Sequence, residues 1–204
     1  MLIVGLTGGI GCGKSTVREL LGRVIDTRTF DCDEISKRIL FSPDFVPVAE
    51  RILGRSAFID GQPDTKRIAQ IIFGDAERKT RFERLLHPLV RQAMKVAKEQ
   101  AEQDGIKLFV VESAIMFESR LSDLCDVTVC ATCGAEEQLR RLTAIRQMTI
   151  EEIQARQAQQ MPDSERQLQA NILIGTDCSL EALRRRVGHL HTYLIDLELR
   201  FSAH

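Results

Sequence analysis

The N-terminal region holds residues whose types and spacing suit phosphate binding. Residues 8–16 read Gly-Gly-Ile-Gly-Cys-Gly-Lys-Ser-Thr, a full G-x-x-x-x-G-K-[ST] pattern between an apolar segment and a helical one. Such glycines let backbone N–H groups curve around phosphate oxygens, Lys14 adds a cation near the β- and γ-phosphates, and Ser15 offers a hydroxyl to Mg²⁺. A plain turn needs neither the Lys-Ser pair nor so many glycines. The candidate nucleotide-binding residues are Gly9, Gly11, Cys12, Gly13, Lys14, Ser15 and Thr16.

A second candidate group is the carboxylate pair Asp31 and Asp33, at the end of an apolar stretch at 27–31. Ligands of open α/β sheets lie beyond the carboxyl ends of the strands, where a side chain faces the bound phosphates. Asp33 is the stronger candidate, because its carboxylate can orient or deprotonate an acceptor hydroxyl and help to hold Mg²⁺. The alternative role of Asp33 is the N-cap of a helix over 34–40, which is compatible with catalysis.

Cations gather toward the C-terminal half of a chain whose net charge is only −1. Arg140, Arg141 and Arg146 are followed by Arg156 on the next predicted helix, as a lid over a transferring phosphoryl group requires. We expect at least one of these arginines to contact the transferring phosphoryl group. The alternative is a solvated helix face, in which the arginines pair with Glu136, Glu137, Glu151 and Glu152.

His87 and Glu112 stand at the edges of predicted elements. His87 precedes Pro88 at a helix start, where its ring can contact an acceptor or simply cap and pack; a lone histidine favours the structural role. Glu112 follows the apolar stretch at 108–111 and is placed equally well for a ligand contact or a helix cap.

The six cysteines lie in apolar or loop contexts, so we expect reduced thiols. Cys130 and Cys133 have redox-motif spacing, but other redox features and a second pair for zinc are missing, which disfavours redox or metal chemistry. Cys12 differs because it lies in the phosphate loop at a helix N-terminus. We hypothesise that its thiol is reactive and that alkylation blocks nucleotide binding.

The elements that position these residues follow an α/β pattern. Apolar stretches too short for helices recur between helical patterns, at 2–6, 27–31, 108–111, 127–131 and 172–174. Strands of this kind are buried on both faces, which predicts an α/β core with a parallel sheet. Together with the glycine-rich motif at 8–16, this predicts a three-layer fold of the P-loop NTPase type.

The helical patterns and the loops between them predict the domain organisation. We expect a helix over 84–101 with Pro88 in its first turn, one from the capping-box pair Thr149 and Glu152 to about Gln160, and a last one after Ser179. The last helix carries an apolar stripe at 183, 187, 190, 194 and 197. We predict a single domain over 1–204, with an acceptor-binding helical insertion at about 35–105 and an arginine-bearing lid at about 138–165.

Composition narrows the function classes. The chain has 204 residues, 44% of them apolar, with 28 Lys and Arg against 29 Asp and Glu. These values fit one globular domain and exclude the global basic field that drives unspecific nucleic-acid or membrane binding. No apolar run approaches the roughly 20 residues of a membrane span, and no basic leader precedes the first strand. We expect a cytoplasmic protein that binds a small-molecule substrate, and nothing indicates an obligate protein partner.

The ordered combination of motifs resembles the dephospho-coenzyme A kinases. Residues 5–16 look like that family's phosphate loop, and Asp31-Cys32-Asp33 is similar to its Asp-x-Asp element, in which the second Asp is the proposed base. Matches outside the loop cover nearly the whole chain: Gly61 and Asp64, Leu86-His87-Pro88, Phe117-Glu118, Gln138 to Arg141, Arg156 with Gln160, and Ala170 to Ile174. The loop alone is shared by many families, whereas this combination is much more specific.

Several positions depart from the family pattern. Cys12 stands where Ser is more usual, and Glu112 begins a Glu-Ser-Ala segment where Asp-x-Pro is common. Arg146 lies one residue beyond the usual Arg-x-x-x-Arg spacing from Arg141. The remaining departures are at Thr65, Asn171, Gly175 and Thr176, so adenine-side contacts are not carried over.

The resemblance implies transfer of the γ-phosphate of ATP to the 3′-hydroxyl of dephospho-coenzyme A, the last step of coenzyme A synthesis, with Mg²⁺. By position it implies catalysis by Lys14, Asp33, Arg141 and Arg146, Mg²⁺ binding by Ser15 and Asp33, and substrate binding by His87, Glu112, Arg156 and Gln160. Two alternatives stay open. One is a P-loop kinase for another small metabolite such as a nucleoside monophosphate; the other is a nucleotide-dependent switch ATPase.

Overall fold

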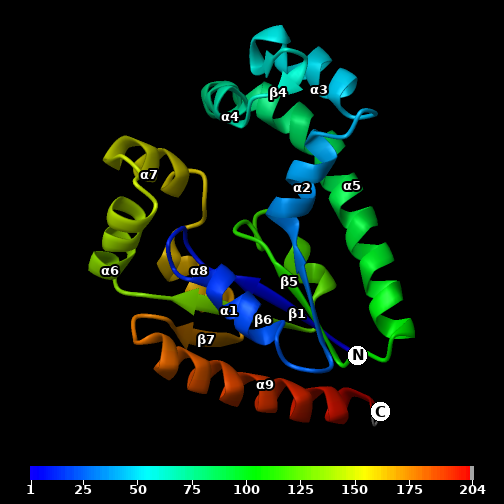
Figure 1. The fold of residues 1–204 in the computed structure, drawn as a ribbon, viewed down its shortest axis with the longest axis vertical. Helices are drawn as coiled ribbons and strands as arrows, with labels where there is room; N and C mark the ends of the chain where they lie inside the picture. The colour runs from blue at the N-terminus through cyan, green and yellow to red at the C-terminus, as the bar shows by residue number, and fades with distance from the viewer. Residues whose placement is uncertain (203–204) are drawn as a thin grey trace. The chain divides into compact units, whose positions relative to one another are not determined.

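The computed structural model describes residues 1–202, which divide into two compact units (Figure 1). One unit comprises Met1–Asp31 and the chain from Lys98 onward; the other is Cys32–Ala97.

The first unit is built on a parallel sheet of β1 (Leu2–Thr7), β2 (Thr27–Asp31), β5 (Leu108–Glu112), β6 (Val127–Thr132) and β7 (Ile172–Gly175). The spatial order is β2-β5-β1-β6-β7, and every pairing is parallel. The five predicted strands are therefore confirmed, and each ends at its expected residue or one residue later. Since β1 lies between β5 and β6, the residues that follow β1 lie beside the ends of both neighbours.

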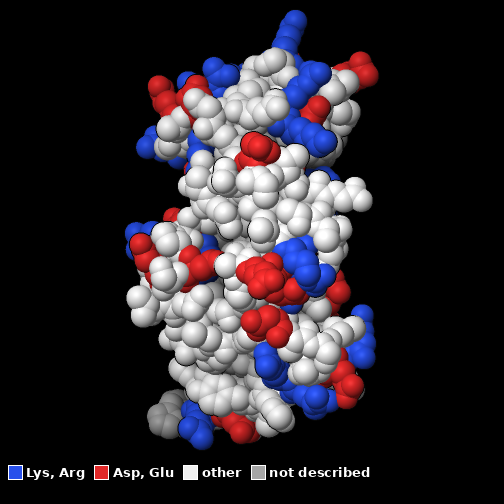
Figure 2. All heavy atoms as spheres, turned by 90° about the vertical axis from the view of Figure 1, so that its left-hand side faces the viewer, with Lys and Arg blue, Asp and Glu red and all other residues white. Residues whose placement is uncertain are grey.

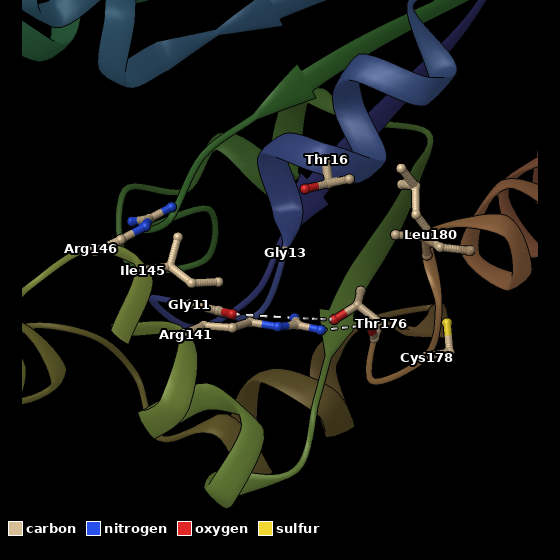
Figure 3. A pocket seen from close by; sticks show the side chains of 10 residues that line it. Gly11, Gly13, Thr16, Arg141, Ile145, Arg146, Thr176, Cys178 and Leu180 are labelled. Atoms are coloured by element: carbon tan, nitrogen blue, oxygen red, sulfur yellow. Dashed lines mark hydrogen bonds between the residues drawn. The ribbon is translucent and has the colours of Figure 1, made fainter. Parts of the chain in front are cut away.

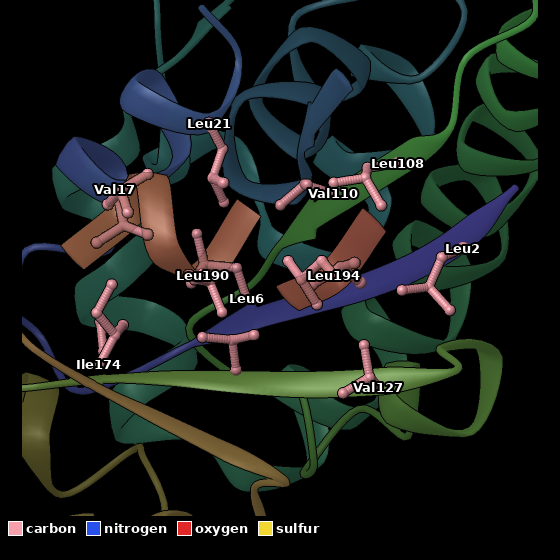
Figure 4. Packing of buried hydrophobic residues seen from close by; sticks show 14 of the residues in the cluster. Leu2, Leu6, Val17, Leu21, Leu108, Val110, Val127, Ile174, Leu190 and Leu194 are labelled. Carbon is pink, nitrogen blue, oxygen red and sulfur yellow. The ribbon is translucent and has the colours of Figure 1, made fainter. Parts of the chain in front are cut away.

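Helices cover the sheet, which confirms the α/β fold class. On one face α1 (Lys14–Leu21) and α9 (Leu180–Ser202) pack against the strands, as Figure 4 shows. Leu183, Val187, Leu190 and Leu194 are buried in this cluster, and Leu197 packs partly against it, so the predicted stripe is a core face. The amide of Ala182 donates to Ser179 Oγ at 3.2 Å and starts α9 where expected.

The chain between β6 and β7 forms short helices. These are α6 (Ala135–Arg140), one turn of π-helix η3 (Arg141–Ile145), α7 (Ile150–Gln157) and α8 (Asp163–Gln169). The capping box of Thr149 and Glu152 is confirmed. Helix α7 ends at Gln157 rather than near Gln160, because single-turn hydrogen bonds replace the helix as the chain approaches Pro162. A 3₁₀ turn, η2 (Leu121–Leu124), follows β5.

The second unit is mainly helical. Its elements are α2 (Cys32–Leu40), α3 (Val46–Leu53), η1 (Arg55–Ala57), the hairpin β3 (Phe58–Ile59) and β4 (Gln62–Pro63), α4 (Thr65–Gly74), and α5 (Ala76–Gln103) as far as Ala97. The expected start of α5 near Arg84 is wrong. Arg78 N donates to Asp75 Oδ1 at 2.9 Å, and this cap starts the helix at Ala76, so Pro88 lies inside it and not in its first turn.

The surface is mixed in charge. On the face shown in Figure 2, most of the surface is uncharged, and the basic and acidic side chains lie in small separate groups. Within residues 1–202, no helix combines the length and the apolar character needed to cross a membrane.

Candidate active site

The loop between β1 and α1 has a conformation that requires glycine. Gly8, Gly11 and Gly13 have φ values of +146°, +81° and +79°, and a Cβ on Gly8 would lie 2.4 Å from the carbonyl oxygen of Ala131. Gly13 is the N-cap of α1 and supplies no side chain to it, so the first N–H groups of the helix are not capped by a side chain. The loop and helix end thus form a backbone cradle for an anion.

Lys14 and Ser15 open α1 directly after this cradle. The ammonium of Lys14 donates to the carbonyl oxygens of Gly8 at 2.9 Å and Gly9 at 3.3 Å, which holds the cation within the loop. Ser15 Oγ donates to Glu112 Oε1 at 3.1 Å. Glu112 is the last residue of β5 and pairs with Leu6 of β1, so the sheet register brings its carboxylate to the start of α1.

Arg18 links the two carboxylates beside Ser15. Its guanidinium donates to Glu112 Oε2 at 2.5 Å and pairs with Asp31 Oδ2 at 3.2 Å. Burial raises the pKa of Glu112, and hydrogen bonding by Arg18 offsets this only in part. Burial of Arg18 is outweighed by Glu112 and Asp31, which raise its pKa. The two shifts have different causes: burial raises the pKa of Glu112, whereas the two neighbouring carboxylates raise the pKa of Arg18.

This oxygen-rich corner fits a hard divalent cation. Ser15 and Glu112 present oxygen ligands beside the phosphate cradle. Mg²⁺ prefers oxygen ligands and takes one or two from the protein when phosphates and water supply the rest. Accordingly, a cluster of three or more His, Cys, Asp or Glu ligands is not needed, and residues 1–202 hold none.

Ile10, at the tip of the loop, is held by the helices that follow β6. Gln138 Nε2 donates to the carbonyl oxygen of Ile10 at 2.8 Å. The backbone N–H of Ile10 donates to Gln160 Oε1 at 3.2 Å. The side chain of Ile10 packs with Leu142 and Ile153. Gln160 therefore contacts the phosphate loop.

The two candidate arginines of the lid differ in their contacts. Arg141 donates to Thr176 Oγ1 at 2.9 Å and to Thr176 O at 2.7 Å (Figure 3). It also donates to Glu137 Oε1 at 2.7 Å. The hydroxyl of Thr176 donates in turn to the carbonyl oxygen of Cys12 at 2.9 Å. Arg146 is exposed, and its side chain makes no hydrogen bond or ion pair with any residue in 1–202. Arg156 is likewise exposed, in the last turn of α7.

Both Arg141 and Arg146 line a cavity of about 260 Å³ beside the loop (Figure 3). Its apolar side chains are Ile145 and, at the start of α9, Leu180 and Leu183, and the loop, Thr16, Thr176 and the two arginines supply the polar part. The lining residues are Gly11, Gly13, Thr16, Arg141, Ile145, Arg146, Thr176, Cys178, Leu180 and Leu183.

Asp33 and His87 belong to the second unit. Helix α2 starts at Cys32, so Asp33 lies inside its first turn, and the expected N-cap position for a helix over 34–40 is wrong. His87 is half-buried in α5, and burial lowers the pKa of its imidazole, which favours the neutral ring at pH 7.

Sequence reasoning missed Arg18 and a buried cation, Arg166, in α8. Arg166 is 1% exposed and contacts the Asp163 carboxylate and the carbonyl oxygen of Met161. The Asp163 carboxylate lies against Gly9, where a Cβ would come within 2.6 Å of Oδ1. The Ser15 to Arg18 spacing of one helical turn was a usable signal for Arg18, whereas α8 has only seven residues and offered none for Arg166.

Comparison with known proteins decides the family. The model of "CoaE: Dephospho-CoA kinase" matches residues 2–182. The chain belongs to the dephospho-CoA kinase family. The dephospho-CoA kinase of Hydrogenovibrio crunogenus is 32% identical over 196 residues, covering 95% of this chain and 98% of that protein. The dephospho-CoA kinase of Streptomyces avermitilis is 33% identical over 200 residues, covering 96% of this chain and 95% of that protein.

Solved structures confirm the fold of this kinase. TT1252 from Thermus thermophilus has a TM-score of 0.80 at 29% identity, covering 95% of this chain and 97% of that one. Dephospho-CoA kinase from Campylobacter jejuni has a TM-score of 0.57 at 21% identity, and the match covers 94% of this chain and 96% of that one. Shikimate kinase from Acinetobacter baumannii has a TM-score of 0.55 at 14% identity, and the match covers 98% of this chain and 96% of that one. The Campylobacter and Acinetobacter structures show the P-loop kinase fold alone. By family, the chain is an ATP-dependent phosphotransferase that acts on dephospho-CoA in coenzyme A biosynthesis, rather than either open alternative.

Proposed function

We propose that this dephospho-CoA kinase binds MgATP on the loop at 8–13 and transfers the γ-phosphate to the acceptor's 3′-hydroxyl with the residues described above. The observation that carries this proposal is the Ser15 to Glu112 hydrogen bond of 3.1 Å beside the backbone cradle. It joins a phosphate-binding helix start to an oxygen ligand on the neighbouring strand.

The triphosphate lies along the loop, with its β- and γ-phosphates at Lys14. The ammonium is already directed into the loop by the carbonyl oxygens of Gly8 and Gly9, and a rotation of its side chain transfers it to phosphate oxygens. The nucleoside occupies the cavity lined by Thr16 and Leu180, because this cavity adjoins the loop and has an apolar wall.

Ser15 and Glu112 hold Mg²⁺, with Asp33 as a further ligand. When bound, Mg²⁺ neutralises charge on the phosphate oxygens and orients them for in-line transfer. Arg18 is a positioning residue, since it fixes the Glu112 carboxylate while its other side pairs with Asp31.

Arg146 stabilises the charge that develops on the transferring phosphoryl group. Its guanidinium lines the cavity and has no competing carboxylate in the described chain, so its donors are available to phosphate oxygens. Arg141 fastens the loop to the segment after β7 through Thr176 and so keeps the cradle in shape. Gln138 and Gln160 fix the loop tip at Ile10.

Asp33 is the proposed base. It follows β2, the strand beside β5, by two residues, and a carboxylate there orients the acceptor hydroxyl and takes its proton. His87 and Arg156 bind the acceptor: a neutral imidazole offers one donor and one acceptor, and the exposed guanidinium suits a phosphate of dephospho-CoA.

The test is ADP release by the purified protein with ATP and Mg²⁺, with and without dephospho-CoA, together with the mass of the product. We expect strong stimulation by the acceptor and one added phosphoryl group. Asp33→Asn should keep ATP binding and lose about 10²- to 10⁴-fold in turnover. Full turnover by this variant removes Asp33 from the mechanism, and stimulation only by nucleoside monophosphates refutes the proposed acceptor.

A further inference from the structure

Two cysteines from distant parts of the sequence meet at the phosphate loop. The Sγ of Cys133, in the connection between β6 and α6, lies 3.5 Å from the Sγ of Cys12 and donates to it. Cys12 is only 2% exposed, whereas Cys133 is partly exposed. All six cysteines are free thiols.

The Cys130-x-x-Cys133 motif is therefore not a pair in space. Cys130 is buried in β6, its sulfur contacts the carbonyl oxygen of Ala131 at 3.7 Å, and within residues 1–202 it makes no hydrogen bond to another thiol. We propose that Cys12 and Cys133 form a modification site, in which a small-molecule disulfide oxidises them to a reversible cross-link that disables the phosphate loop.

The chemistry is two successive thiol–disulfide exchanges. The accessible Cys133 thiolate attacks a disulfide RSSR, forms a mixed disulfide and releases one RSH after proton uptake. Cys12 then attacks the Cys133 sulfur and expels the second RSH. Two protein thiols lose two hydrogen atoms and two electrons, and RSSR is reduced to two RSH. A small thiol in excess reverses both steps.

The cross-link draws Cys12 toward Cys133, and we expect this to displace the loop. A disulfide bond is about 2.05 Å long, so the sulfurs must approach by roughly 1.5 Å from 3.5 Å. The backbone of Cys12 is held at both ends, by its N–H donated to Gly9 O at 3.1 Å and its carbonyl accepting from Thr176 Oγ1 at 2.9 Å. Pulling the side chain strains these contacts and the amides that form the cradle. The loss of nucleotide binding rests on the proposed function; the cross-link itself does not.

The surroundings of Cys133 make its oxidation slow at neutral pH. Burial, the Cys12 thiol and Asp177 raise the pKa of Cys133 to about 12, and Arg141 opposes this only in part. The thiolate fraction, and with it the first exchange, therefore increases with pH across the neutral range. The pair remains reduced unless the disulfide is abundant.

The test treats the full-length protein with oxidised glutathione, followed by intact-mass measurement, peptide mapping and ATP binding, before and after a reducing thiol. We expect a loss of two hydrogen atoms, a Cys12–Cys133 peptide, and ATP binding weakened by more than about tenfold and restored by reduction. Cys133→Ser should bind ATP normally and resist the effect, whereas the matched control Cys130→Ser should cross-link as the parent does.

Three outcomes overturn the proposal. A mapped Cys130–Cys133 peptide, or no cross-link in a folded protein at pH 9, refutes the site. Retention of ATP binding by the cross-linked protein refutes its effect on the loop. If the reduced parent does not bind ATP but the cross-link forms, the proposed nucleotide site fails while the thiol pair stands.

Discussion

Arg141 and Arg146 lie five residues apart, yet their guanidinium groups have different partners. Arg141 is committed to Thr176 and Glu137, whereas Arg146 is exposed at the cavity. Arg146→Ala should reduce turnover by about 10³-fold, the lower end of the effect of an arginine that stabilises charge on a transferring phosphoryl group. The melting temperature should change little. Arg141→Ala should lose partly buried hydrogen bonds and about 1–3 kcal/mol of stability. Steady-state kinetics and thermal melts of both variants check this; full turnover by Arg146→Ala contradicts it.

The raised pKa of Glu112 makes the stability of the folded protein depend on pH. Its pKa in the folded protein is raised by burial, so ionising it costs stability as pH increases through that pKa. Glu112→Gln should therefore melt as high as the parent or higher at pH 7.5, with the difference vanishing toward pH 4, while Mg²⁺-dependent ATP binding is weakened. Melts in a chelating buffer between about pH 4 and pH 8 measure the difference.

Glu137 is the control with the opposite sign. Hydrogen bonds from Arg140 and Arg141 lower its pKa to about 2, so its stabilising contribution is present above the ordinary carboxylate pKa and is lost as pH decreases toward 2. Glu137→Gln should melt lower than the parent at neutral pH. Equal pH dependence of the Glu112 and Glu137 variants contradicts the assignment.

At the scale of the element, the turn from β1 into α1 depends on one close approach. A methyl group at Gly8 would meet Ala131 O at 2.4 Å, and φ is +146°, so Gly8→Ala must displace either the loop or β6. We expect loss of ATP binding and a lower melting temperature. Gly134→Ala is the matched control, because its φ is −64° and the nearest atom is 3.7 Å away. That variant should change stability by less than about 1 kcal/mol, because the lower conformational entropy of the unfolded chain offsets the poorer N-cap of α6. Calorimetric ATP titration and melts compare the two, and normal binding by Gly8→Ala contradicts the steric argument.

Sequence patterns predicted strands and helix starts correctly where interactions between neighbouring residues determine them. The five strands of the parallel sheet were predicted because runs such as Leu108–Val111 are too short and too apolar for surface helices, whereas the short β3–β4 hairpin was missed. The start of α5 was misplaced because Pro88 suggested a first turn, whereas the Asp75 cap lies thirteen residues upstream. The capping box at Thr149 was correct since both of its hydrogen bonds are local.

At the scale of the whole molecule, the site depends on contacts that no periodicity encodes. The loop motif and the family matches predicted the activity, which the family finding confirms, whereas the roles of the single residues stay predictions. The partners lie far apart in sequence: Gln138 with Ile10, Arg141 with Thr176, and Arg18 with Glu112. These pairs follow from the order of the strands in the sheet, and the sequence pattern predicts parallel strands without giving their order.

Global stability offers a last test, because α9 and the sheet share one core. Gly188 lies exposed inside α9 with open space where a Cβ would be, so Gly188→Ala should gain about 0.5–1 kcal/mol from helix propensity. In a chain of this size that is on the order of 1–4 °C in melting temperature. Gly105 also has open space, but its φ is +72°, so Gly105→Ala should cost about 1–2 kcal/mol. An added Cβ has open space at both positions, so opposite shifts of the melting temperature would reflect the backbone conformation and not a steric clash. Equal shifts would mean that the helix propensity of α9 does not limit the stability of the core against which it packs.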